Sequence, residues 1–288
     1  MFERIFSRFS IRNAPVGMLA STGFIVTLSA AATIAACSDS GTAPGGARLV
    51  YGPAQALGAG TARTYITYDE SGKPASLGVA LSEASLTNLP MTPLPGGGMA
   101  AATLELALPA EAKATGFDHV MLDWNPMGHE PDMVYTVPHF DFHFYTISDA
   151  AQMAMTPADP QFSDKLEKLP PESYRPVGMI KLPGGVPMMG AHWVDPTSPE
   201  LQPPPNNKLF TRTFLYGSYD GHFIFYEPMI TKAHIESLKT VPGNAITSVI
   251  RTAPSVEHPG SFPTQYTLAW DAAAKEYHIA IDKLVPRS

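Results

Sequence analysis

The chain has 288 residues and a formal net charge of −7. Its first 36 residues contain three Arg and one Glu, so the remainder carries 16 basic and 25 acidic side chains. This acidic balance, with no basic run, excludes nucleic acid as a partner. The roughly 250 residues that follow are enough for one sizeable hydrophobic core.

Residues 1–36 have the pattern of a lipoprotein signal peptide. Three Arg precede an uncharged apolar run, which ends in Ile-Ala-Ala and then Cys37. This ending resembles a bacterial lipobox, whose Cys carries the lipid, and Ser38 after it favours the outer membrane or its periplasmic side. An uncleaved transmembrane anchor is the alternative, because the run is just long enough to span a bilayer. Either way, we expect the folded part to lie outside the cytoplasm, attached to the bacterial envelope.

The sequence after Cys37 predicts a short tether and then one domain. Residues 37–47 are rich in Gly and Ser and are expected to be a flexible tether. Residues 48–288 show no repeat and no second composition, so we expect a single β-rich domain. Cys37 is the only Cys of the chain, which excludes an internal disulfide and a Cys-based metal cluster.

In chain order, most of the predicted elements are strands that alternate in polarity and flank turns. Short helices are expected at 82–89, after the capping Ser148 at 150–155, and at 231–239. Residues 156–210 are Pro-rich with little periodicity, apart from one helical turn near residue 165; loops of this length tend to be functional or poorly ordered. The predicted strands are Thr61–Tyr68, Ser76–Leu81, Thr103–Leu108, His119–Trp124, Pro138–Tyr145, Thr211–Tyr219, His222–Tyr226, Gln265–Trp270 and Tyr277–Leu284.

These elements predict a mainly β fold. The strands are joined by turns, including the strong hairpin signal Asp220-Gly221, and helices are few and short. We therefore expect an antiparallel β-barrel or sandwich with a few short helices and long Pro-rich loops.

The segment Pro-His-Phe-Asp-Phe-His-Phe-Tyr at 138–145 is the most informative one. In a strand, successive side chains point to opposite faces, so three Phe would enter the core while His139, Asp141, His143 and Tyr145 share the other face. The two His lie four residues apart, about 13 Å along a straight strand, too far to bind one ion without a bulge or strong twist. The face is either a metal or catalytic site or a hydrogen-bonded polar face.

Other residues of ligand type lie in loops near these strands. Histidine binds Zn, Cu, Fe or Ni, and two or three His with one carboxylate form a recurrent ligand set. We predict a divalent transition metal, of unknown identity among Zn, Fe, Ni and Cu, bound by His139, His143, His192 and Glu227. Supporting groups or alternative ligands would be His129, Asp141, Tyr145, Asp195 and His222. No local motif has the tight spacing of a known zinc site, so the ligands would come from distant segments.

Four motifs together resemble a known family. They are Trp-Asn-Pro-x-Gly-His-x-Pro at 124–131, the segment 138–145, Gly-x-His-Trp-x-Asp at 190–195, and Glu-Pro-Met-Ile-Thr at 227–231. They resemble a family of poorly characterised secreted bacterial proteins related to an envelope-stress protein of Thermus thermophilus under an extracytoplasmic sigma factor, over about residues 50–240. The resemblance implies a β-rich extracytoplasmic domain and allows a ring-shaped homo-oligomer, but it implies no known reaction.

Two functions of different classes follow from the sequence. The first is a metal-binding envelope lipoprotein, with metal-dependent catalysis on an unknown substrate as an open extension. The second is a non-catalytic structural or stress-response protein that forms homo-oligomers, in which the polar face is a hydrogen-bond network or an oligomer contact. A serine hydrolase is a poorer third, because no Gly-x-Ser-x-Gly motif is present.

Overall fold

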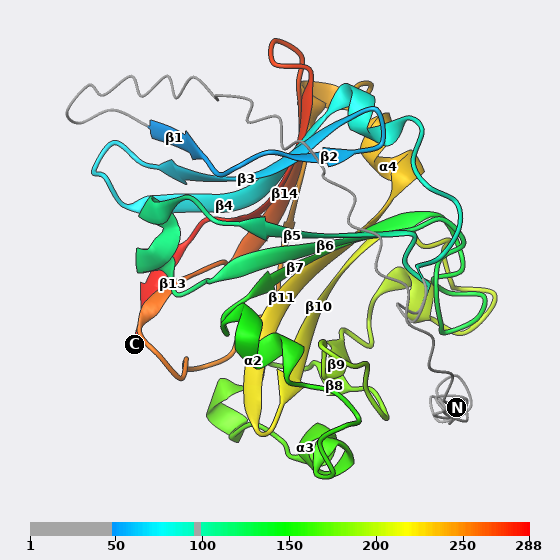
Figure 1. Ribbon diagram of the computed structural model, residues 1–288, viewed down its shortest axis with the longest axis vertical. Coiled ribbons are helices and arrows are strands. Elements are labelled where there is room, and N and C mark those ends of the chain that lie inside the picture. Colours follow the sequence, from blue (N-terminus) through cyan, green and yellow to red (C-terminus); the bar gives the residue numbers. More distant parts are fainter. Residues whose placement is uncertain (1–47, 95–98) are drawn as a thin grey trace, which may run out of the picture.

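Two open antiparallel sheets make up most of the protein (Figure 1). The structure is a computed structural model that describes residues 48–94 and 99–288. The predicted signal peptide at 1–36, the tether at 37–47 and the lipidation site Cys37 lie outside the described residues. No helix among those described is long and apolar enough to cross a membrane.

The first sheet has the strand order β1-β3-β4-β15-β14-β12, with β2 paired to β3. The predicted hairpins at 61–81 and 265–284 form its β3–β4 and β14–β15 pairs. Its strands are β1 (Arg48–Tyr51), β2 (Gln55–Leu57), β3 (Gly60–Tyr68), β4 (Pro74–Ser82), β12 (Ala245–Val249), β14 (Gln265–Asp271) and β15 (Glu276–Asp282).

The second sheet has the order β5-β6-β7-β11-β10-β9-β8 and contains the segment 139–145 as a central strand. Asp220 and Gly221, both with positive φ, turn the chain between β10 and β11. The strands are β5 (Ala102–Ala107), β6 (His119–Asn125), β7 (His139–Tyr145), β8 (Ile180–Lys181), β9 (Ala191–Val194), β10 (Arg212–Tyr219) and β11 (His222–Thr231). A separate pair joins β13 (Gly260–Phe262) to β16 (Val285–Arg287).

The main hydrophobic core lies between the two sheets. Phe140, Phe142 and Phe144 are fully buried in it, together with Leu77 and Ile279 of the first sheet. The prediction that the three Phe of β7 share a core face is therefore confirmed. Because both sheets are open and pack face to face, the fold is a β-sandwich and not a closed barrel.

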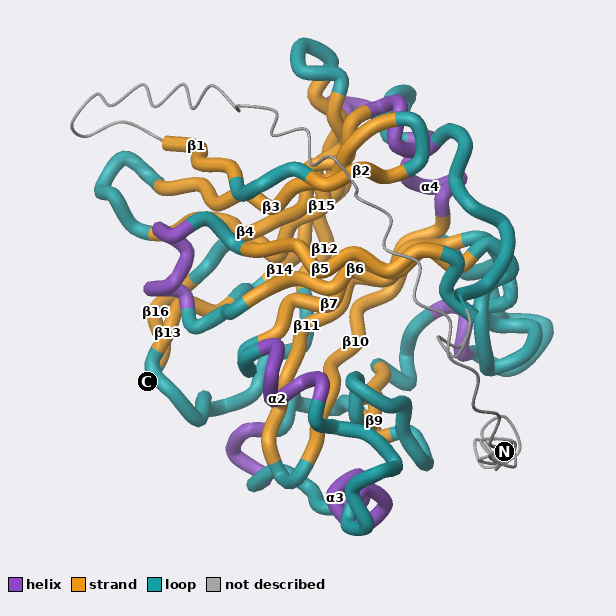
Figure 2. The backbone as a smooth tube through the Cα atoms, viewed as in Figure 1, coloured by secondary structure: helices purple, strands orange, loops and turns teal. Residues whose placement is uncertain are grey.

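Helices are short and peripheral (Figure 2). The capping role predicted for Ser148 is confirmed, because its hydroxyl accepts a hydrogen bond from the Ala151 N–H in the first turn of α2. The α-helices are α2 (Asp149–Met153), α3 (Phe162–Glu167) and α4 (Lys232–Ser237). The 3-10 turns are η1 (Glu83–Leu86), η2 (Ala110–Thr115), η3 (Glu172–Tyr174), η4 (Pro199–Leu201) and η5 (Pro242–Asn244).

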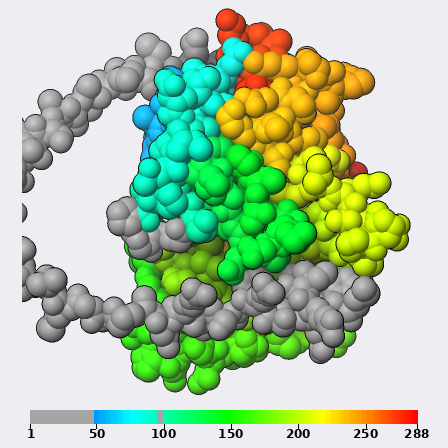
Figure 3. Space-filling view, turned by 90° about the vertical axis from the view of Figure 1, so that its right-hand side faces the viewer, coloured from blue at the N-terminus to red at the C-terminus, as the bar shows by residue number. Residues whose placement is uncertain are grey.

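The Pro-rich segment 156–210 contributes β8 and β9 to the second sheet, and its helix α3 packs on the face of that sheet that points away from the first sheet. Phe162 and Leu166 of α3 pack against Tyr145 and Phe225 of that face. Farther along the sheet, a second apolar cluster joins the loop before β7 to the loop before β10, and Figure 3 shows these two loops, in green and yellow, next to each other on the surface. These two apolar clusters thus enclose the polar face of β7, one toward each end of the strand.

Candidate metal centre

The pairing of β7 with its neighbours brings carboxylates beside its histidines. On one side, β6 places Asp123 opposite Asp141 and Asn125 opposite His139. On the other side, β11 runs antiparallel to β7, with Tyr226 opposite Phe144 and Met229 opposite Asp141. Glu227 therefore falls beside His143, on the same face of the sheet.

A first ligand set, the His143 group, consists of His143, His192 and Glu227. The Nε2 atom of His143 lies 3.5 Å from Glu227 Oε1, and Nε2 of His192 lies 3.7 Å from Glu227 Oε2. His192 reaches this position because β9 pairs with β10, where Gly217 is its register partner. His143 and Glu227 are almost fully buried, whereas the His192 side chain is 18% exposed.

A second ligand set, the His139 group, consists of His129, His139 and Asp141. Nε2 of His139 lies 3.2 Å from Asp141 Oδ1, and Nε2 of His129 lies 3.4 Å from Asp141 Oδ2. His129 comes from the loop between β6 and β7. Gly128 precedes it with φ +69°, and a Cβ at that position would overlap the Tyr135 carbonyl, so glycine is required where the loop folds back.

The distances within both sets fit ligands arranged around one ion. In each set, one ligand atom from every residue lies within 4.8 Å of the others. Two ligands at about 2.0–2.1 Å from a zinc-like ion, at the tetrahedral angle, are about 3.4 Å apart. The four contacts, at 3.2 to 3.7 Å, agree with this separation. Three of them exceed the usual N–H···O hydrogen-bond range of about 2.7–3.2 Å.

Hydrogen bonds to the backbone orient the imidazoles of the His139 group. Nδ1 of His139 lies 2.7 Å from the Val137 carbonyl oxygen, and Nδ1 of His129 lies 2.7 Å from that of Glu130. A carbonyl only accepts, so each Nδ1 carries a proton, and Nε2 of each ring is left facing Asp141. Metal-binding histidines in proteins are held in this way.

Several of the converging atoms have no hydrogen-bond partner. In the described part of the chain, this holds for buried Nε2 of His139, Oδ1 of Asp141 and Oε2 of Glu227. Asp123 adds a third buried carboxylate on this face: its Oδ1 accepts from the Thr103 hydroxyl, while Oδ2 has no partner and lies 3.6 Å from His143 Nδ1. Leaving such groups unpaired costs stability.

Burial controls the protonation of the His143 group. It lowers the pKa of His143 to about 4, and burial with the neighbouring His143 lowers the pKa of His192 to about 3. Burial, reinforced by Asp141 and Asp123, raises the pKa of Glu227 well above its ordinary value. Without a metal, burial thus favours the neutral form of all three side chains of this set.

The His139 group is charged differently. Burial opposes ionisation of Asp141, but the adjacent His139 and His129 outweigh it and hold the Asp141 pKa well below its usual range. Burial also opposes the protonation of His129, yet the adjacent Asp141 carboxylate outweighs burial and raises the pKa of His129. Burial raises the pKa of Asp123, between the two sets, to about 7.

The structure brings together three of the four ligands expected from the sequence and separates the fourth. His143, His192 and Glu227 converge, whereas His139 lies with His129 and Asp141. The rise of a strand explains the separation, because β7 has no bulge that would bring its two His to one point. His129 and Asp141, expected as supporting or alternative ligands, take part in the second set.

The other expected residues have different partners. Tyr145 donates its hydroxyl to the Met188 carbonyl at 2.9 Å, and His222 is exposed beside Glu257 at 2.7 Å. Asp195 pairs with Arg251 at 2.5 Å and lines a separate cavity of about 680 Å³. Asp123 was not among the expected site residues. Its alternation with His119 on one strand was the available signal, but its pairing with β7 cannot be seen in the sequence.

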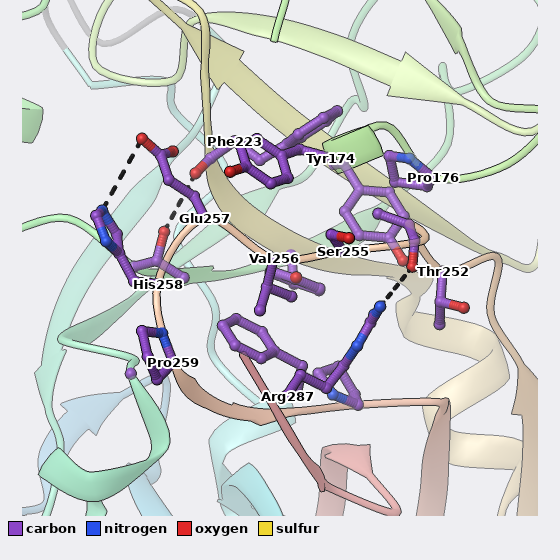
Figure 4. Close-up of a pocket in the computed structure, with 17 residues that line it drawn as sticks. Tyr174, Pro176, Phe223, Thr252, Ser255, Val256, Glu257, His258, Pro259 and Arg287 are labelled. Carbon is purple, nitrogen blue, oxygen red and sulfur yellow. Dashed lines mark hydrogen bonds and ion pairs between the residues drawn. The ribbon is translucent and has the colours of Figure 1, made fainter. Parts of the chain in front are cut away.

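A small pocket of about 90 Å³ lies elsewhere (Figure 4). It includes Tyr226, which points to the opposite face of β11 from Glu227 because the two are adjacent in a strand. Arg287 donates to the Ala253 and Pro254 carbonyls, and Glu257 contacts His222, so the charged groups of the pocket are already paired. We therefore place the candidate centre on the outer face of the second sheet.

Comparison with known proteins identifies one partial match. The pattern of the TTHB210-like family, described as hypothetical protein TTHB210 and named for a protein of Thermus thermophilus, matches residues 69–124. This segment runs from the turn before β4 to Trp124 of β6 and includes Asp123, but it contains none of the six residues of the two ligand sets. Neither a curated protein nor a solved structure matches the chain.

Proposed function

We propose that this protein is an envelope lipoprotein that binds a divalent transition metal at the His143 group. His143 of β7, His192 of β9 and Glu227 of β11 would be its ligands. Neutral imidazole suits Zn, Cu, Fe and Ni, and one carboxylate balances part of the charge of the ion.

The observation that carries this proposal is the surplus of buried carboxylate. Asp123, Asp141 and Glu227 lie on one enclosed face, and among the described residues no Lys or Arg contacts any of them within 4.0 Å. Buried carboxylates ordinarily require a cation or a full set of donors. The alternative of a purely hydrogen-bonded network is disfavoured, because Glu227 Oε2 and Asp123 Oδ2 have no hydrogen-bond partner.

The arrangement also supports a catalytic extension of the proposal. Two His and one carboxylate leave coordination positions open, as in catalytic zinc sites and in non-haem iron oxygenases. His192 is the partly exposed member of the set, so an open position on its side can be reached from solvent. A metal there would act as a Lewis acid or activate a bound water or dioxygen.

Elemental analysis tests the metal proposal. The full chain is purified without chelator and without nickel resin, beside His192→Ala and Glu227→Gln. We expect each variant to hold one metal ion per chain fewer than the wild type. The matched control is His222→Ala, which removes an exposed histidine outside both sets and should leave the metal content unchanged. Equal metal content in wild type, His192→Ala and Glu227→Gln would refute the site.

The envelope location is a separate part of the proposal and rests on the lipobox-like sequence that ends in Cys37. The proposed link to envelope stress has a separate basis, the resemblance of the four motifs described above. Labelling cells with a radioactive or clickable fatty acid should mark the wild type and leave Cys37→Ser unlabelled. Labelling of both proteins, or of neither, would exclude lipidation at Cys37.

A further inference from the structure

We propose that the His139 group is a second metal site, so that the protein holds two divalent transition-metal ions on one face of the sheet. Its ligands are Nε2 of His129, Nε2 of His139 and the Asp141 carboxylate. This site does not depend on the His143 group for its geometry, and the two proposals can fail separately.

The first argument is that the ligand atoms of both histidines already face the Asp141 carboxylate. Backbone carbonyls at 2.7 Å hold the Nδ1 protons of His129 and His139, which leaves both Nε2 atoms facing one carboxylate. His139 is fully buried and its Nε2 has no hydrogen-bond partner. A buried imidazole nitrogen directed at an equally unpartnered Asp141 Oδ1 is the arrangement that a cation between them would satisfy.

The second argument is that the carboxylate itself is held in place. The Asn125 side-chain amide donates to Asp141 Oδ2 at 2.7 Å, within the buried interior. Asn125 is the register partner of His139, so the same strand pairing positions both the ligand and the group that orients the carboxylate. A metal site requires such outer hydrogen bonds to fix its ligands.

The third argument concerns the relation between the two sets. Asp141 and His143 are two residues apart on β7, so the sets are neighbours separated by about 7 Å of strand. Asp123 lies directly opposite Asp141 and has its free Oδ2 near His143. Its carboxylate therefore faces both sets and adds negative charge where two cations would otherwise repel each other.

The competing interpretation is a His–Asp ion pair without metal, in which a protonated His129 donates to Asp141. It accounts for one of the two histidine contacts of Asp141, the one with His129. It leaves His139 Nε2 and Asp141 Oδ1 facing each other at 3.2 Å without a hydrogen bond. A metal accounts for all three residues together.

The test is metal stoichiometry of the full chain loaded with Zn²⁺ alone and then desalted. His129→Ala and His192→Ala form a matched pair, because each removes the most exposed imidazole of one set, with 30% and 18% of the side chain exposed. We expect two ions in the wild type and in His222→Ala, one in each single variant and none in the double variant. Asp141→Asn, of nearly the same shape, repeats the test should His129→Ala not fold.

The outcomes separate the two proposals. One ion in the wild type, kept by His129→Ala and Asp141→Asn but lost by His192→Ala, would overturn the second site and leave the first intact. One ion lost by His129→Ala but kept by His192→Ala would overturn the first and leave the second. Loss of metal in His222→Ala as well would show adventitious binding and overturn both. Titration with Co²⁺ provides an independent count through its visible absorption, which should saturate at two equivalents.

Discussion

Glu227 is a carboxylic acid in an almost fully buried position. Its side chain is 2% exposed on a central strand, and burial with two neighbouring acids raises its pKa well above its ordinary value of 4.5. Above pH 4.5 the unfolded chain has lost the Glu227 proton while the folded, metal-free protein keeps it. Unfolding then releases a proton, so this residue makes stability fall as pH rises from 4.5 towards the folded pKa.

We expect Glu227→Gln to remove this loss of stability in the metal-free protein. Urea unfolding in EDTA at pH 5 and pH 8 should show the wild type losing stability relative to the variant between the two values. His143 and His192 act in the opposite sense, because their lowered pKa values make stability rise with pH up to about 6.5. Both proteins contain these histidines, so the comparison removes their effect. Parallel pH profiles would contradict the assignment.

In the His139 group, Asn125 is not a ligand itself but orients the ligand Asp141. We expect Asn125→Ala to weaken metal binding at the His139 group by about 10- to 100-fold, because the Asp141 carboxylate loses the donor that orients it. The affinity of the His143 group should change little. Competition with a coloured zinc chelator measures both affinities in one titration, and an equal change at both would show a general loss of structure instead.

Among the elements, the β9–β10–β11 junction determines whether the His143 group can form. The Phe225 ring lies over Gly217 and packs against the imidazoles of both His143 and His192, with ring centroids 4.9 and 5.4 Å away. A Cβ on Gly217 would overlap that ring. Gly217 thus leaves the space that the Phe225 ring occupies beside the two imidazoles.

Gly217→Ala is therefore expected to displace Phe225 and to disturb the His143 group from behind. Overpacking of this kind destabilises a protein by about 1–3 kcal/mol. Metal affinity at the His143 group should fall, while that of the His139 group should be kept. Chemical denaturation and the same chelator competition measure the two effects. Unchanged zinc affinity in Gly217→Ala would show that Phe225 does not position the ligands.

The element scale also shows what the sequence could predict. Alternation identified β3, β4, β5, β6, β7, β10, β11, β14 and β15, because each is long enough to display a periodic pattern of side chains. It missed β12, whose residues are mostly exposed, and the strands of two to four residues, which show too little periodicity. The missed short strands are β1, β2, β8, β9, β13 and β16. The missed strands lie at or next to the edges of the two sheets, or in the separate β13–β16 pair.

The candidate site could be predicted only in part, because its residues come from several strands and loops. Local spacing correctly indicated that His139 and His143 share a face and cannot easily share an ion. The partition into two sets depends on which strands flank β7 and on their register, and neither is encoded within one segment. Asp123 and His129 gain their significance only from the pairing of β6 with β7 and from the loop that returns over it.

For the whole molecule, the two sets predict a stability that depends on metal. An ion that binds only the folded state at 100 times its Kd stabilises it by about 2.7 kcal/mol per site. We expect Zn²⁺ to raise the melting temperature of the wild type and EDTA to reverse the change. The gain should be smaller in His129→Ala and in His192→Ala, and absent in the double variant. A wild-type melting temperature that is indifferent to Zn²⁺ would contradict binding to the folded protein.

Each ligand set combines two ligands from central strands with one ligand from a peripheral segment. His139, Asp141, His143 and Glu227 project from central strands, whereas His129 belongs to a loop and His192 to a four-residue strand near the sheet edge. Local opening is easiest at such peripheral segments and hardest in central strands. Exchange of an ion with the surroundings would therefore proceed through His129 or His192 without unfolding the sandwich. The time for which the protein retains an ion and the affinity for that ion would then depend on different parts of the fold. The retention time would depend on the segments that carry His129 and His192, and the affinity on β7 and β11.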